Sequence, residues 1–201
     1  GWLDENADRP FFSFFHTFEV RDPFRARDPW ASQFGADLED SPDNSVVVKP
    51  VTAGKTAGPS QGARLVWPDG SSQNEDALSS EQLASLISLY DSGIAHVDEA
   101  LGLLFTKLRE LKLERDTLVI VTSNHGEALG ERGRVGHRHL ADEDLRVPLV
   151  FVFPRRLEDA RVIPGTARSV DVLPTVLDLL GLPPVEGIDG TSLVPLMEDK
   201  P

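Results

Sequence analysis

The chain has 201 residues, of which 40% are hydrophobic, and it carries a formal net charge of −13 and no cysteine. A chain of this length can bury the core of one domain or two. Its net negative charge argues against nucleic acid or anionic membrane as the main partner. The lack of cysteine excludes disulfides and thiolate metal sites, and no apolar run is long enough to span a bilayer. The first ten residues lack the regions of a signal peptide, so the sequence predicts no compartment. The sequence starts without Met, and we expect it to continue upstream.

The N-terminal part divides into an aromatic segment and a long polar one. Residues 9–20 (RPFFSFFHTFEV) are densely aromatic, which predicts a buried central strand and a site loop within residues 1–24. Residues 25–78 are rich in Pro, Gly, Ser and Asp and show little periodicity. We therefore predict an irregular insertion there, with one short strand at Ser45–Lys49.

The remainder, residues 79–201, has the most regular pattern. Ser79 and Gln82 offer a capping box, and apolar residues then recur at spacings of three and four to about Lys112, which indicates one long helix. TLVIVTS and VPLVFVF predict strands, and a last helix begins near Asp171 and ends at Gly181. This order indicates an α/β fold with a mostly parallel central sheet flanked by helices. The predicted buried stripe of the long helix consists of Leu83, Ile87, Tyr90, Ile94, Val97, Leu101, Leu104, Leu108 and Leu111.

Polar residues follow directly after the predicted strand DTLVIV, in the segment TSNHGE. Ligands of open α/β sheets collect beyond the carboxyl ends of the strands, so Asn124 and His125 are candidates for a binding site. The alternative is a polar turn in which His125 is hydrogen-bonded locally. The segment alone leaves both interpretations open.

The run from Tyr90 to Met197 resembles the second half of a sulfatase. TLVIVTSNHGEALGERG is similar to the family pattern TLVIVTSDHGE.LGEHG, and SVDVLPTVLDLLGLPPVEGIDGTSLVPLM is similar to DLxPTLLDLAGLP…DGxSLxPLL. RPFFSFFHTFEVRDPF resembles the family strand PFFLFLHYFDPHDPY more weakly. Residues 25–78 match no family pattern. The resemblance implies an incomplete alkaline-phosphatase-like fold.

The resemblance also implies a chemistry and a set of residues. Sulfatases cleave sulfate esters with a divalent metal, usually Ca²⁺ with Mg²⁺ or Mn²⁺ as alternatives, and with a formylglycine made in a C/S-x-P-S-R motif. Asn124 and His125 fall on the metal-binding pair, and Glu127 is expected to orient His125. His137 falls where a Lys or His contacts the sulfate, and Arg21 falls where a His helps the leaving group, so both are catalytic candidates.

The sequence departs from the family pattern in three ways. It contains no C/S-x-P-S-R motif, so this chain has no nucleophile, and we expect formylglycine upstream and an inactive isolated chain. Asn124 replaces an Asp, and Arg21 replaces a His and is a poor general acid. His16 is expected in the core, and His139 is a weaker alternative to His137.

Three functions therefore stay open. The first is a hydrolase of small-molecule or carbohydrate sulfate esters. The second is a phosphodiesterase or phosphonate-ester hydrolase of the same superfamily. The third is a catalytically inactive, sulfatase-like binding domain. The sequence predicts no oligomeric state.

Overall fold

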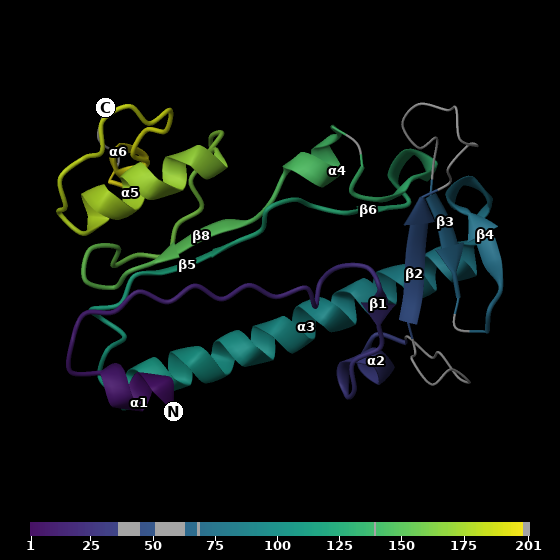
Figure 1. Ribbon diagram of the computed structural model, residues 1–201, viewed down its shortest axis with the longest axis horizontal. Helices are drawn as coiled ribbons and strands as arrows, with labels where there is room; N and C mark the ends of the chain where they lie inside the picture. The colour runs from purple at the N-terminus through teal and green to yellow at the C-terminus, as the bar shows by residue number, and fades with distance from the viewer. Residues whose placement is uncertain (36–44, 51–62, 68, 139, 199–201) are drawn as a thin grey trace. The chain divides into compact units, whose positions relative to one another are not determined.

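The computed structural model describes residues 1–35, 45–50, 63–67, 69–138 and 140–198. The chain forms two compact units (Figure 1). The first unit comprises Gly1–Lys107 and His125–Arg146, and the second comprises Leu108–Asn124 and Val147–Pro201. Within the described residues, no helix is both long enough and apolar enough to cross a membrane.

The first unit contains a four-stranded antiparallel sheet, which lies beside the N-terminal end of α3 (Ser80–Glu110) (Figure 1). Along β2 and β3 the side chains alternate, so that Val48 and its partner Leu65 are buried while Arg64 is exposed. The buried face, which includes Phe24, packs against Leu86 and further apolar side chains, as expected for a sheet with one covered face. The strands, in spatial order, are β1 (Phe24–Arg25), β2 (Ser45–Pro50), β3 (Ala63–Val66) and β4 (Ser72–Asn74).

This sheet corrects the prediction of an irregular insertion at residues 25–78. The strand predicted at Ser45–Lys49 is confirmed as part of β2, but β3 and β4 were missed. Both missed strands are three or four residues long, which is too short for a clear alternating pattern.

The long helix α3 (Ser80–Glu110) has 31 residues, and its predicted capping box is confirmed. The Ser79 backbone N–H donates to Gln82 Oε1 (3.0 Å), and the Gln82 N–H donates to Ser79 Oγ (3.2 Å). The predicted stripe is partly wrong, because Leu86 and Leu89 are buried under the sheet while Ile87 and Ile94 are exposed. Apolar residues occupy several faces of this helix, so the spacing alone did not select the covered face.

The aromatic segment does not form the predicted buried strand. Residues 10–18 have no regular structure, and Phe12 and Phe14 are 87% and 78% exposed. His16 is exposed as well, not in the core. A strand needs hydrogen-bonded neighbours, and none of the described strands pairs with this segment. A short helix, α1 (Trp2–Asn6), precedes it, and α2 (Trp30–Gln33) follows β1.

The second unit contains the two predicted core strands and the C-terminal helices. β5 (Val119–Thr122) pairs with β8 (Leu149–Val152) in antiparallel orientation. All pairs among the described strands are antiparallel, so the predicted mostly parallel pairing does not occur there. The connection from β5 to β8 holds a hairpin and a one-turn helix, not the long crossover helix that parallel neighbours usually need. The α/β character itself is confirmed.

The helix α5 (Val172–Leu179) ends as predicted. Gly181 adopts φ +67°, its N–H donates to Asp178 O (3.1 Å), and the Leu182 N–H donates to Leu177 O (2.8 Å). These two bonds form the Schellman motif, in which the left-handed residue is usually glycine. The helix follows η3 (Ser169–Asp171) and precedes α6 (Val194–Met197).

A buried threonine joins α5 to the start of α6. The Thr175 hydroxyl donates to Asp171 O (2.6 Å) and accepts from the Leu193 N–H (2.9 Å). Thr175 is completely buried. One side chain therefore satisfies two backbone groups that would otherwise be costly to bury.

Candidate active site

A short hairpin after β5 builds the candidate site in the first unit (Figure 1). β6 (Ala128–Leu129) pairs with β7 (Val135–Gly136), with Ala128 opposite Gly136, and η2 (Glu131–Gly133) lies in the turn. Glu127 immediately precedes β6 and His137 immediately follows β7. The antiparallel register therefore brings these two side chains together although they are ten residues apart.

The two side chains form a hydrogen-bonded pair. His137 Nδ1 lies 3.0 Å from Glu127 Oε2, and the Glu127 side chain is only 2% exposed. Burial, and then the negative charge of Asp22, raise the pKa of Glu127 to about 7. We predicted that Glu127 orients His125, but its hydrogen bond goes to His137.

Arg21 approaches the other nitrogen of the same imidazole. Arg21 Nη2 lies 3.3 Å from His137 Nε2. A guanidinium carries only donors, so Nε2 must accept and Nδ1 must hold the proton that it donates to Glu127. Burial, and then the Arg21 charge, lower the pKa of His137, which favours this neutral form. The guanidinium also lies 5.6 Å from the centre of the Phe18 ring.

His125 completes the cluster by stacking on His137. The two ring centres are 4.0 Å apart and the planes differ by 17°. His125 Nδ1 lies 2.8 Å from the carbonyl oxygen of Gly126, so this nitrogen donates and Nε2 is the acceptor. The possible ligand atoms of His125, Glu127 and His137 all lie within 4.8 Å of one another. Imidazole and carboxylate groups gathered at this distance fit a divalent metal ion.

Asn124, the other predicted metal ligand, is an exposed residue and the last one in the first segment of the second unit. It joins His125 directly through the peptide bond. An amide oxygen is a neutral metal ligand, so Asn124 brings no charge to the segment.

Gly126 holds the segment against a neighbouring one-turn helix, α4 (Asp142–Leu145). Its N–H donates to Asp144 O (2.7 Å), and a Cβ at this position would lie 2.0 Å from Glu143 O. Only glycine permits this approach, which fixes the backbone between His125 and Glu127. Glu143 itself forms an ion pair with Arg132 (2.7 Å).

Sequence reasoning did not assign Asp22 and Asp144 to the site. Asp22 adjoins Arg21, and both carboxylates contribute to the raised pKa of Glu127. In the sequence, Asp22 was distinguished only by its place in the Arg-Asp-Pro segment of residues 21–23. Asp144 lay within an acidic run that is typical of a solvated surface. His139, the predicted alternative to His137, lies outside the described residues.

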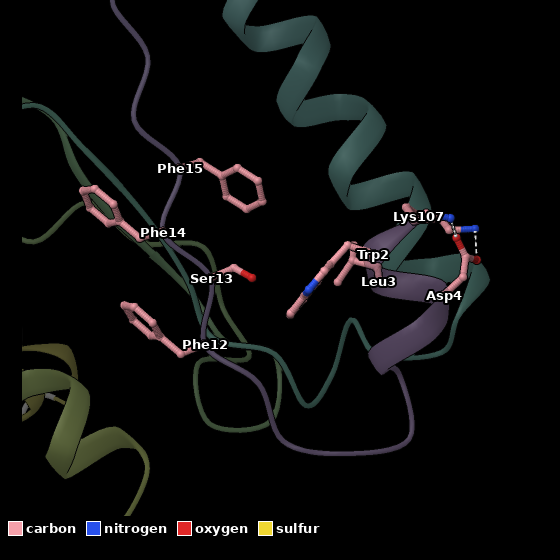
Figure 2. Close-up of a pocket in the computed structure, with 9 residues that line it drawn as sticks. Trp2, Leu3, Asp4, Phe12, Ser13, Phe14, Phe15 and Lys107 are labelled. Carbon is pink, nitrogen blue, oxygen red and sulfur yellow. Dashed lines mark hydrogen bonds and ion pairs between the residues drawn. The ribbon is translucent and has the colours of Figure 1, made fainter.

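An open apolar pocket of about 510 Å³ lies elsewhere in the first unit, between α1 and the aromatic segment (Figure 2). Phe12 and Phe14 point to one side of the segment and Phe15 to the other, as in an extended chain. Lys107 Nζ pairs with Asp4 Oδ1 (2.5 Å) at its edge. The pocket shares no residue with the histidine cluster, and it holds none of the imidazoles that could bind a metal.

The sequence profile of the Sulfatase family matches residues 1–182. The chain belongs to the sulfatase family. PehA of Trinickia caryophylli, a multifunctional alkaline phosphatase superfamily protein, is 29% identical over 100% of this chain and 40% of its own length. The N-acetylglucosamine-6-O-sulfatase of Bacteroides thetaiotaomicron is 31% identical over 55% of this chain and 20% of its own length.

A solved structure supports the same fold. The phosphonate monoester hydrolase SpPMH from Silicibacter pomeroyi matches with a TM-score of 0.57 and 29% identity, over 61% of this chain and 24% of that one. The predicted family and alkaline-phosphatase-like fold class are thus confirmed. This sulfatase chain spans at most 40% of the length of these relatives.

Proposed function

We propose that this chain supplies part of the active site of a sulfuric ester hydrolase. The observation that carries the proposal is the cluster of Arg21, His125 and His137 in a chain of the sulfatase family. The cationic donor Arg21 and two imidazoles, of which His125 is a potential metal ligand, meet in this cluster. That combination suits an ester that carries a negative charge.

The residues divide between metal and ester. Sulfatases use a divalent metal, and we propose that Asn124 and His125 hold it in part, with Ca²⁺ first and Mg²⁺ or Mn²⁺ as alternatives. When bound, the metal polarises the sulfuryl group. Arg21 and His137 face the ester's anionic oxygens, to which His137 donates from Nε2 when the ester's charge favours the protonated ring. Glu127 keeps this ring in place through its hydrogen bond at Nδ1 (3.0 Å). Arg21 stays protonated, so it stabilises charge and transfers no proton.

The nucleophile belongs to another part of the complete protein in this proposal. The 201 residues contain no cysteine and no S-x-P-S-R sequence, so we place the formylglycine and the remaining metal ligands outside them. The chain alone is then inactive.

The proposed substrate is a small-molecule or carbohydrate sulfate ester. Similarity to an N-acetylglucosamine-6-O-sulfatase supports a sulfated sugar. The second candidate is a phosphonate or phosphate diester, which the likeness to SpPMH favours. Loss of activity is the third, because Asn124 and Arg21 both depart from the family pattern.

The test compares p-nitrophenyl sulfate with p-nitrophenyl phenylphosphonate as substrates of the complete protein loaded with a divalent metal. We expect faster turnover of the sulfate, and a loss of about 10²–10³ in kcat for His137→Ala, the usual effect of removing a charge-stabilising donor. His16→Ala, which removes an exposed imidazole from the same unit, should retain full activity. Faster phosphonate turnover would select the second candidate. No turnover of either ester, even after Asn124→Asp and Arg21→His are combined, would select the inactive one.

A further inference from the structure

Phe18 is a large aromatic residue that buries little of its surface in the first unit. It is 61% exposed, and it belongs to neither apolar core of the described residues. The exposed imidazole of His16 lies against it, with ring centres 4.6 Å apart. The guanidinium carbon of Arg21 lies 5.6 Å from the centre of the same ring. A phenylalanine this exposed gains little from burial, so its contact with a cation is the feature that needs a reason.

The backbone between the two residues is held in place. The Glu19 carbonyl oxygen lies so close to Gly93 of α3 that a Cβ at this glycine would be 2.8 Å from it. The Glu19 N–H donates to Thr17 Oγ1 (3.2 Å). These contacts fix the main chain before Arg21 but not its long side chain, which loses much rotamer entropy when it is held in one position. The guanidinium therefore needs partners of its own.

Three groups of the same unit contact the Arg21 side chain. Its Nη2 lies 3.3 Å from His137 Nε2, and its Nε lies 3.9 Å from Asp22 Oδ1, which is beyond hydrogen-bond distance. The Phe18 ring is the third partner. An aromatic ring attracts a cation through its π-electrons and occupies none of the five N–H donors of the guanidinium. Phe18 can thus hold the group and leave its donors for an anion.

We propose that Phe18 is a positioning residue, which holds the Arg21 guanidinium beside His137 with its remaining N–H groups directed at the anionic oxygens of the ester. Removal of the ring leaves the charge of Arg21 but releases its side chain, so an anion binds more weakly although no cation is lost. The effect on anion binding rests on the proposed function. The effect on the Arg21 side chain does not.

The first experiment follows the mobility of Arg21 in the complete protein by NMR of the arginine side chains, with the Arg21 signal identified by its loss in Arg21→Gln. We expect Phe18→Leu to lower the Nε order parameter of Arg21, whereas Phe18→Trp, which keeps an aromatic face of the strongest kind for a cation, should preserve it. Phe12→Leu, the same change at another exposed ring of the same segment, should leave it unchanged.

A fluorinated phenylalanine at position 18 keeps the size of the ring and weakens its negative face. It should lower the Arg21 order parameter in the same direction as Phe18→Leu, and it tests the contact even if the leucine variant does not fold. An Arg21 order parameter that stays unchanged on fluorination, or in a folded Phe18→Leu variant, would overturn the proposal.

The second experiment measures the binding of inorganic sulfate to the complete protein, loaded with a divalent metal, by calorimetry. Phe18→Leu should weaken sulfate binding about 2–5-fold, the usual size of an exposed cation–π contact. In the Arg21→Gln background, Phe18→Leu should have no further effect, because the ring acts through Arg21. Equal effects of Phe18→Leu in both backgrounds would overturn the positioning role. A protein that binds no sulfate, but whose Arg21 becomes mobile when the ring is removed, would refute only the proposed function.

Discussion

The buried carboxylate of Glu127 should make the first unit less stable as the pH rises. Its pKa is raised from 4.5 to about 7 in the folded protein, a difference of 2.5 units (7 − 4.5). At about 1.4 kcal/mol per unit, this corresponds to about 3 kcal/mol. The folded state keeps the proton between pH 4.5 and 7, where the unfolded state has lost it. The free energy of unfolding should therefore fall as the pH rises through this window, and the whole decrease of about 3 kcal/mol should be reached above pH 7.

Substitution of Glu127 by Gln removes the titration and keeps an oxygen that accepts from His137 Nδ1. Urea unfolding followed by tryptophan fluorescence reports on this unit, because Trp2, Trp30 and Trp67 all belong to it. With a chelator present, the free energies of unfolding of the Glu127→Gln variant and the unmodified chain are measured at pH 4.5 and at pH 7.5. The difference between them should change by about 3 kcal/mol in favour of the variant as the pH rises from the first value to the second. Glu99→Gln, an exposed change on α3, should stay within about 0.5 kcal/mol at each pH. A difference between the Glu127→Gln variant and the unmodified chain that stays constant with pH would refute the reasoning.

Two further changes test the packing around the site and in the second unit. Gly126→Ala places a Cβ 2.0 Å from Glu143 O and should destabilise the fold by about 1–3 kcal/mol or more. Gly102→Ala, whose Cβ meets no atom within 4 Å in α3, should instead stabilise the fold by about 0.5–1 kcal/mol. Thermal unfolding compares the two variants, and equal effects would contradict the close approach at Gly126. Thr175→Val removes the two buried hydrogen bonds that join its hydroxyl to backbone groups. It should cost about 1–3 kcal/mol, seen as faster hydrogen exchange in α5 peptides. Thr191→Val, at an exposed position, is the matched control, and equal exchange in both variants would show that the hydroxyl of Thr175 does not stabilise the helix.

Local signals in the sequence predicted the elements whose stabilising contacts are also local. The capping box of Ser79 and Gln82 and the glycine end at Gly181 each depend on residues within a few positions of one another. The sequence likewise placed Asn124 and His125 after a strand because apolar and polar residues change abruptly there. These features needed no knowledge of what packs against them.

Contacts between distant segments could not be predicted in this way. The partner of Glu127 depends on the register of β6 and β7, and strands of two residues leave no periodicity from which a register can be read. The covered face of α3 depends on which side the sheet occupies. The aromatic segment reads as a strand by composition, but strand formation requires a neighbour, and none of the described strands provides one.

The hairpin explains how the site can be ordered by the first unit itself. Arg21, Glu127 and His137 form a continuous row of hydrogen bonds in which each group fixes the role of the next. Arg21 requires an acceptor at Nε2, which places the proton on Nδ1, and Glu127 accepts that proton's hydrogen bond. The Val135 N–H donates to Glu75 Oε2 (2.8 Å), which ties β7 to a segment sixty residues earlier. The orientation of the His137 ring is therefore set by contacts inside this unit, before any metal or ester binds.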